Sequence, residues 1–112
     1  MKIEEQKVGG TLLIRILETR LGADRAVAFK QTIGRLIDRG EQRLLLDFSS
    51  VEFIDSSGLG AILSVLKRLG KDGELAVCGI TDPVGSMLKL TRMDRIFTVH
   101  RSVEDALNAH CR

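Results

Sequence analysis

One short segment of the sequence combines residue types that could do chemistry: Asp55-Ser56-Ser57-Gly58-Leu59-Gly60. Leucines and isoleucines recur at helical spacing after it, so we expect the segment to form the start of a helix. Asp and Ser are favoured there because their side chains accept hydrogen bonds from the unpaired N–H groups of the first turn. A helix cap is therefore one interpretation, and it requires no function.

A second interpretation gives the same segment a regulated charge. The N–H groups and the positive end of the dipole at a helix start favour an anion. A phosphate ester on Ser56 would be tolerated there, and it would add roughly −1.5 to −2 charges at neutral pH. Asp55 is already negative, so the modified surface would become strongly negative. A docking partner would respond to that charge, and Gly58 and Gly60 add no side-chain bulk that would keep the partner away.

Other kinds of site fit the sequence less well. Gly58-Leu59-Gly60 is followed by Leu63 where a dinucleotide fingerprint has glycine, and no Gly-Lys-Ser/Thr of a phosphate-binding loop follows. Neither Ser56 nor Ser57 lies in the Gly-x-Ser-x-Gly turn of a serine hydrolase. We find no carboxylate pair placed for acid–base work. Metal-ligand spacing is also absent from the His and Cys residues, which are His100, His110, Cys78 and Cys111. We therefore predict a binding protein without metal, cofactor or enzymatic activity.

The composition excludes several classes of partner. The 112 residues carry a formal net charge of +2, which gives no electrostatic case for nucleic acid or for an anionic membrane surface. The apolar runs are far shorter than the roughly 20 residues that span a bilayer, and the acidic N-terminal segment does not resemble a secretory signal. We expect a cytoplasmic protein in which Cys78, inside an apolar run, is a buried thiol and Cys111 is a thiol in the tail.

Hydrophobic patterning predicts a single α/β domain over residues 1–112. An N-terminal β-hairpin with Gly9-Gly10 at its turn opens the chain. Asp24 is expected to cap the first helix and Gly40 to end it, and Asp82 is expected to cap a later helix with Pro83 in its first turn. The predicted strands are residues 2–8, 11–17, 44–48, 75–78 and 95–99, and the predicted helices are residues 24–39, 55–69, 82–90 and 102–107.

The order of these elements predicts the architecture. After the hairpin, helices alternate with strands, and right-handed crossovers of this type build a parallel sheet. The hairpin adds one antiparallel pair. We therefore expect a mixed, mostly parallel sheet of four to five strands with helices packed mainly on one face.

A family resemblance is carried by residues 44–63, LLLDFSSVEFIDSSGLGAIL, and continues through residues 73–79, 88–99 and 104–107. These stretches resemble the STAS family, in particular its bacterial anti-sigma factor antagonists. The order of predicted elements is also similar back to the first hairpin, so the resemblance covers nearly the whole chain.

The resemblance implies a single-domain switch protein. The partner would be an anti-sigma factor that is also a serine kinase, and it would phosphorylate the serine directly after the Asp. That serine is Ser56 here, with Ser57 as the second choice, while Asp55, Ser57 and Gly58 would shape the docking loop. The unphosphorylated form would bind the kinase and free a sigma factor. A serine phosphatase of the PP2C type would reverse the modification.

One stretch departs from the family pattern and keeps alternatives open. Members usually carry Gly-x-Leu-Asp between the second strand and the first helix, and the aligned residues here are Thr19-Arg20-Leu21-Gly22. Thr19 and Gly22 replace the Gly and the Asp, and Asp24 could take over the cap. The departure favours a non-phosphorylated scaffold or a soluble subunit of a membrane transporter as the alternative function. Nucleotide binding by the loop is the third hypothesis.

Overall fold

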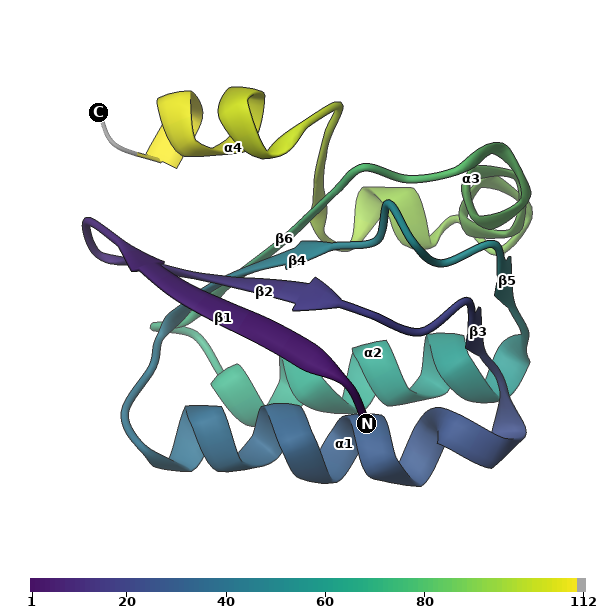
Figure 1. Ribbon diagram of the computed structural model, residues 1–112, viewed down its shortest axis with the longest axis horizontal. Coiled ribbons are helices and arrows are strands. Elements are labelled where there is room, and N and C mark those ends of the chain that lie inside the picture. Colours follow the sequence, from purple (N-terminus) through teal and green to yellow (C-terminus); the bar gives the residue numbers. More distant parts are fainter. Residues whose placement is uncertain (111–112) are drawn as a thin grey trace.

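Hydrogen-bonded strands form the centre of the fold, and the computed structural model describes residues 1–110 of the chain (Figure 1). Seven strands, four α-helices and one 3-10 turn follow one another along the sequence. In chain order they are β1 (Ile3–Val8), β2 (Thr11–Ile16), β3 (Arg20–Leu21), α1 (Ala23–Asp38), β4 (Arg43–Asp47), β5 (Phe53–Ile54), α2 (Ser56–Leu69), β6 (Glu74–Cys78), α3 (Asp82–Leu90), η1 (Met93–Arg95), β7 (Thr98–His100) and α4 (Val103–His110).

The main sheet is mixed and has the strand order β1-β2-β4-β6-β7. The β1–β2 hairpin is antiparallel, with Val8 opposite Thr11, and Gly9 between them has a φ of 60° that suits glycine. All other neighbours in the sheet are parallel. The structure therefore confirms the predicted hairpin and the predicted mixed, mostly parallel sheet of four to five strands, which has five.

The central strands are buried on both faces, which is typical of parallel strands with continuous apolar runs. In β4, Leu44 and Leu46 face the larger core, whereas Leu45 faces a second, smaller core on the other side of the sheet. Side chains alternate between the two faces of a strand, so each central strand contributes to both cores. Each large side chain fully buried in this way stabilises the fold by roughly 1.5–3 kcal/mol.

Helices cover the two faces of the sheet unequally. α1 and α2 lie side by side across one face, and α4 lies on the opposite face (Figure 1). Phe29 of α1 and Ile62 of α2 are completely buried in the larger core, while Ala106 of α4 is buried in the smaller one. This agrees with the predicted placement of helices mainly on one face, with α4 as the helix that covers the other.

Three local predictions were wrong. Asp24 does not cap α1, because that helix begins at Ala23 and Gly22 occupies the capping position without a side-chain bond. Asp82 does not cap α3, since Thr81 precedes that helix and Asp82 is its first residue. The last strand begins at Thr98, three residues later than predicted, because Met93–Arg95 forms a 3-10 turn. The predicted buried thiol, Cys78, is buried and free, whereas Cys111 lies outside the described residues.

Candidate functional site

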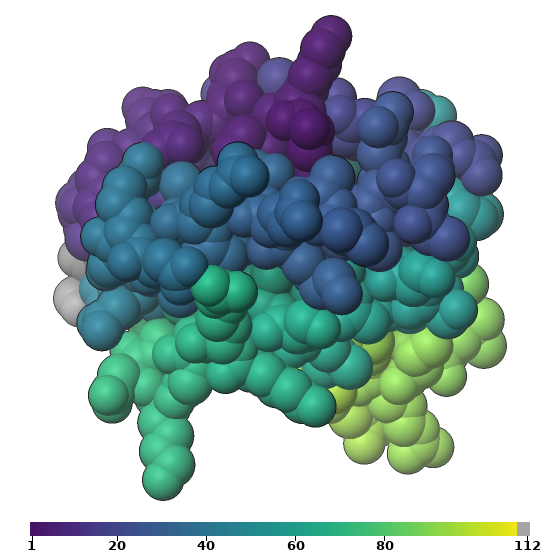
Figure 2. Space-filling view, turned by 90° about the horizontal axis from the view of Figure 1, so that it is seen from below, coloured from purple at the N-terminus to yellow at the C-terminus, as the bar shows by residue number. Residues whose placement is uncertain are grey.

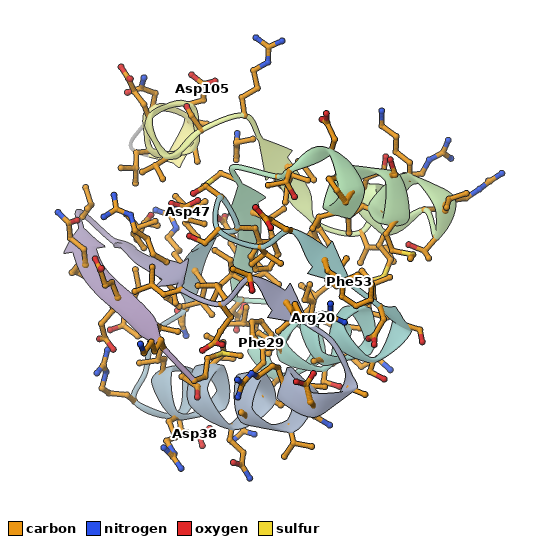
Figure 3. All side chains as sticks on the ribbon, turned by 45° about the vertical axis from the view of Figure 1, so that its right-hand side comes forward. Arg20, Phe29, Asp38, Asp47, Phe53 and Asp105 are labelled. Carbon is orange, nitrogen blue, oxygen red and sulfur yellow. The ribbon has the colours of Figure 1, made fainter. Side chains whose placement is uncertain are left out.

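A short parallel ladder that the sequence did not predict leads into the site. β3 pairs with β5 in a separate two-stranded sheet, with Arg20 opposite Phe53 and Leu21 opposite Ile54. Leu21 and Ile54 point into the core. Arg20 and Phe53 point outward, and the guanidinium carbon lies 4.3 Å from the centre of the Phe53 ring (Figure 3). This distance is in the range of a cation–π contact.

The carboxylate of Asp55, directly after β5, joins the starts of two helices. Its Oδ1 accepts a hydrogen bond from the backbone N–H of Gly58 at 3.0 Å, which caps α2. Its Oδ2 accepts a second hydrogen bond, at 3.2 Å, from the backbone N–H of Ala23, the first residue of α1. The predicted cap at Asp55 is therefore present, and the same side chain also supplies the cap that Asp24 was expected to give α1.

Ser56 and Ser57 are the first two residues of α2, and both are exposed. Within the described part of the chain, neither hydroxyl group has a hydrogen-bond partner. Both serines therefore stand at the positive end of a helix dipole with their hydroxyl oxygens free to react or to bind. The geometry presents the two serines equally, so it does not choose between them.

Gly58 and Gly60 have different roles in this segment. A Cβ atom on Gly58 would lie 2.0 Å from the carbonyl oxygen of Leu21, so only glycine allows β3 and α2 to approach this closely. A Cβ atom on Gly60 would meet nothing within 4 Å. The expectation that both glycines keep the surface open therefore holds for Gly60, whereas Gly58 is buried and is needed for packing.

The stretch that departs from the Gly-x-Leu-Asp pattern lies directly beside Asp55. A Cβ atom on Gly22 would be 3.0 Å from Asp55 Oδ2, which is tighter than ordinary contact. The carbonyl oxygen of Thr19 accepts hydrogen bonds from the backbone N–H groups of Glu52 and Phe53 at 2.8 and 3.2 Å. Gly22 thus leaves room for the Asp55 carboxylate, and Thr19 contributes through its backbone.

Arg20 and Phe53 belong to this surface, although the sequence did not indicate it. Side chains two residues apart in a strand point to the same side, so Phe53 and Asp55 share one side of the ladder, and Arg20 and Gly22 share the matching side of β3. The Arg20–Phe53 pair therefore lies next to the Asp55 carboxylate that caps both helices. Phe53, an aromatic residue two positions before Asp55, was the available signal in the sequence. Its partner Arg20 lies in β3, a strand of two residues that is too short to predict.

Several chemistries find no support in the described residues. Among the side chains that the structure describes, there is no group of three or more His, Cys, Asp or Glu residues that could hold a metal ion. No helix within residues 1–110 is long and apolar enough to cross a membrane. What the segment 55–60 offers is a capped helix start with two accessible hydroxyl groups beside an exposed aromatic–cation pair.

Comparison with known proteins identifies the family of the chain. The sequence model of the STAS domain matches residues 2–106. The chain belongs to the STAS domain family. This STAS domain is 31% identical over 110 residues to a Bordetella bronchiseptica protein described as a candidate anti-sigma factor antagonist, BtrV, with 97% of this chain and 94% of that protein covered.

Two further relatives extend the likeness of this STAS domain. The anti-sigma F factor antagonist of Paenibacillus polymyxa is 29% identical over 96% of this chain and 92% of its own length. The crystal structure of a candidate anti-sigma factor antagonist from Thermotoga maritima superposes with a TM-score of 0.88 at 26% identity, covering 98% of this chain and 95% of that one. The sequence likeness and the structural likeness thus both extend over nearly the whole chain.

Proposed function

We propose that this STAS domain is an anti-sigma factor antagonist controlled by reversible phosphorylation of Ser56. The unphosphorylated form binds an anti-sigma factor that is also a serine kinase, and so releases a sigma factor. Phosphorylation of Ser56 ends that complex, and a serine phosphatase of the PP2C type restores it. The protein acts in the cytoplasm as a binding module and not as an enzyme.

The exposed hydroxyl group of Ser56 supports this proposal, and the family resemblance, in which the serine directly after the Asp is modified, selects Ser56 over the equally exposed Ser57. Ser56 is exposed at the first position of α2, and its hydroxyl has no partner among the described residues. The same surface holds Asp55 and the Arg20–Phe53 pair. A phosphate added there would place about two further negative charges beside the Asp55 carboxylate. A partner that docks over this segment would then meet like charge and unfavourable desolvation, so its complex would dissociate.

Matched serine variants test the proposal. The wild-type protein, Ser56→Ala and Ser57→Ala are each incubated with the anti-sigma factor kinase and Mg-ATP, and the phosphate is mapped by mass spectrometry. We expect one phosphate on Ser56 in the wild type and in Ser57→Ala, and none in Ser56→Ala. Phosphate at any site outside the Ser56-Ser57 pair, or undiminished labelling of Ser56→Ala, would refute the proposed regulation.

Gly22 favours a second function for the same surface, a scaffold or transporter subunit that is never phosphorylated. The carboxylate that relatives usually carry at this position is missing, so a kinase that needs it would not recognise the chain. Purification together with an integral membrane complex, combined with full function of Ser56→Ala, would support this second function over the first. Calorimetry with ATP and with GTP tests nucleotide binding by the loop, for which we expect no heat.

A further inference from the structure

Exposed apolar side chains gather where α3, η1 and β7 meet. Leu90 at the end of α3 is 80% exposed, Ile96 after η1 is 51% exposed, and Val99 in β7 is 41% exposed. Residues 89–101, together with Ile80, are called the α3–β7 surface below. Single exposed apolar residues are normal, but several within one short segment indicate a binding surface. Part of this segment forms the yellow-green lobe at the lower right of Figure 2.

Two adjoining hollows give this surface shape. One, of about 390 Å³, lies between α3 and β7 and is lined by the apolar residues Ile80, Leu88, Phe97 and Val99, with Lys89 and Asp94 beside them. The other, of about 270 Å³, is lined by Ile80, Val99, His100 and Arg101. Ile80 and Val99 border both hollows. Successive pockets of this kind suit alternate side chains of an extended segment.

β7 is also an edge strand of the main sheet, and it differs from the other edge. β1, at the opposite edge, carries Glu4, Glu5 and Lys7, charged side chains of the kind that keep a further strand from pairing. β7 consists of Thr98, Val99 and His100, without Lys, Arg, Asp or Glu. β7 is short, with three residues, but no charged side chain on it opposes pairing, so its backbone can accept an added strand.

The charge of the α3–β7 surface indicates the chemistry of its partner. Residues 89–101 contain four cations, Lys89, Arg92, Arg95 and Arg101, and one acidic residue, Asp94. Within the described range, none of the four cationic side chains forms an ion pair. Elsewhere in the described chain, six cations are paired with carboxylates and six are not, so the surface is distinguished by having four unpaired cations within 13 residues. The unpaired charge therefore favours an acidic partner.

We propose that the α3–β7 surface binds an acidic segment of another protein, in extended conformation beside β7. The backbone of the segment would pair with β7, its apolar side chains would enter the two hollows, and its carboxylates would meet the four cations. An anionic membrane would also attract the cations, but a flat lipid surface would neither fill the hollows nor pair with a strand. None of residues 55–58 lines either hollow, so this proposal does not depend on the phosphorylation of Ser56.

A pair of designed peptides tests the proposal on the full-length protein. The probe is a ten-residue peptide that alternates Glu with Val or Leu, and the control peptide has Lys in place of each Glu. We expect the Glu peptide to shift the backbone amide signals of residues 96–101 in ¹H–¹⁵N spectra and to bind at least tenfold more weakly when salt is raised from 50 to 500 mM. The Lys peptide should produce no such shifts.

Matched substitutions locate the binding. Val99→Lys puts a charge on the edge strand, and Val27→Lys makes the same change at an exposed residue of α1. Arg95→Glu reverses a charge of the surface, and Arg35→Glu does so on α1. Val99→Lys and Arg95→Glu should each weaken binding of the Glu peptide at least tenfold, whereas the two α1 variants should bind the peptide as the wild type does. Circular dichroism checks that all four variants are folded.

Four results would overturn the proposal: no binding of the Glu peptide, equal binding of the Lys peptide, shifts that map outside residues 80–101, or unchanged binding by Val99→Lys. Two further measurements distinguish other occupants. Binding of phosphatidylglycerol vesicles through these residues, without peptide binding, would assign the surface to a membrane. A dimer in sedimentation that Val99→Lys dissociates would assign it to a second copy of the chain.

Discussion

Oδ2 of Asp55 lies 3.2 Å from the backbone nitrogen of Ala23, a residue 32 positions earlier in the chain. The other carboxylate oxygen of Asp55 accepts a hydrogen bond from Gly58 in its own helix. A single side chain thus satisfies one N–H group at the start of α1 and another at the start of α2. The residue directly before Ser56 is therefore part of the connection between the two helices that cover the larger core.

Replacing Asp55 should cost more than the loss of an ordinary helix cap. Asp55→Ala removes the acceptors of two helix starts, so we expect the free energy of unfolding to fall by about 2 kcal/mol, twice the usual ~1 kcal/mol. Urea unfolding measures it. Asp55→Asn keeps one acceptor oxygen, so its free energy of unfolding should lie between those of the wild type and Asp55→Ala. Asp24→Ala is the matched control and should cost less than about 1 kcal/mol. An equal cost for both alanine variants would contradict the shared cap.

Adding one methyl group at Gly58 or at Gly60 should have opposite effects. In Gly58→Ala the new Cβ would collide with the backbone oxygen of Leu21 at 2.0 Å, which cannot move independently. We expect a loss of at least about 3 kcal/mol, or failure to fold. Gly60→Ala meets open space and gains helix propensity, so it should be more stable by up to about 1 kcal/mol. Thermal unfolding of the pair checks this, and similar melting temperatures would refute it.

A negative charge at Ser56 should change binding and leave the fold intact. Ser56 is exposed at a helix start, so Ser56→Asp should alter the free energy of unfolding by less than about 1 kcal/mol. Binding to the anti-sigma factor should weaken strongly, because the new carboxylate lies beside Asp55. Ser86→Asp places the same charge on an exposed residue of α3 and should bind as the wild type. A large loss of thermal stability in Ser56→Asp would show instead that Ser56 is packed.

Cys78 should resist thiol reagents until the protein unfolds. Burial, and next the negative charge of Asp47, raise the pKa of the Cys78 thiol to about 12. In a Cys111→Ser background, Ellman's reagent should therefore react only slowly with native protein at pH 8 and rapidly in urea. Fast reaction of the native protein would contradict the burial.

The raised pKa of Cys78 also predicts how stability depends on pH. In the unfolded chain the thiol pKa returns to about 8.5, so the folded state holds the proton more tightly. The resulting stabilisation is complete below about pH 8.5 and is lost as the pH rises toward 12. Urea unfolding from pH 8 to 11 should show a shallower decline for Cys78→Ala than for the parent protein. Parallel declines would contradict the shifted pKa.

The predictions that succeeded from sequence rest on local or periodic signals. Short apolar or β-prone runs identified the strands, helical apolar spacing identified the helices, and Gly9-Gly10 identified the hairpin turn. The expected cap at Asp55 is also local, since the residue that it caps is Gly58. In contrast, Asp24 satisfied the sequence pattern for a cap and makes no such bond. The sequence indicates which residues are of a type that can cap a helix. Only the folded structure shows which of them lies within hydrogen-bond distance of the helix start.

The short elements and long-range contacts could not be predicted in the same way. β3 and β5 have two residues each, too few for any periodicity, and they exist because their backbones meet. That meeting places Arg20 over Phe53 and forces glycine at position 58. The α3–β7 surface likewise depends on Ile80 and Val99 coming together from separate elements.

The sequence by itself determined the mixed α/β architecture and the exposed helix start at Ser56, because both follow from periodicity and from preferences within one turn of chain. The STAS family was indicated separately, by the resemblance of residues 44–63. Only the tertiary structure decided that Asp55 also holds α1 and that Gly58 is required for packing. Each of these depends on a distance between residues far apart in the chain, from Asp55 to Ala23 and from Gly58 to Leu21. Local preference carries no information about such distances, since they are set by how the helices and strands pack.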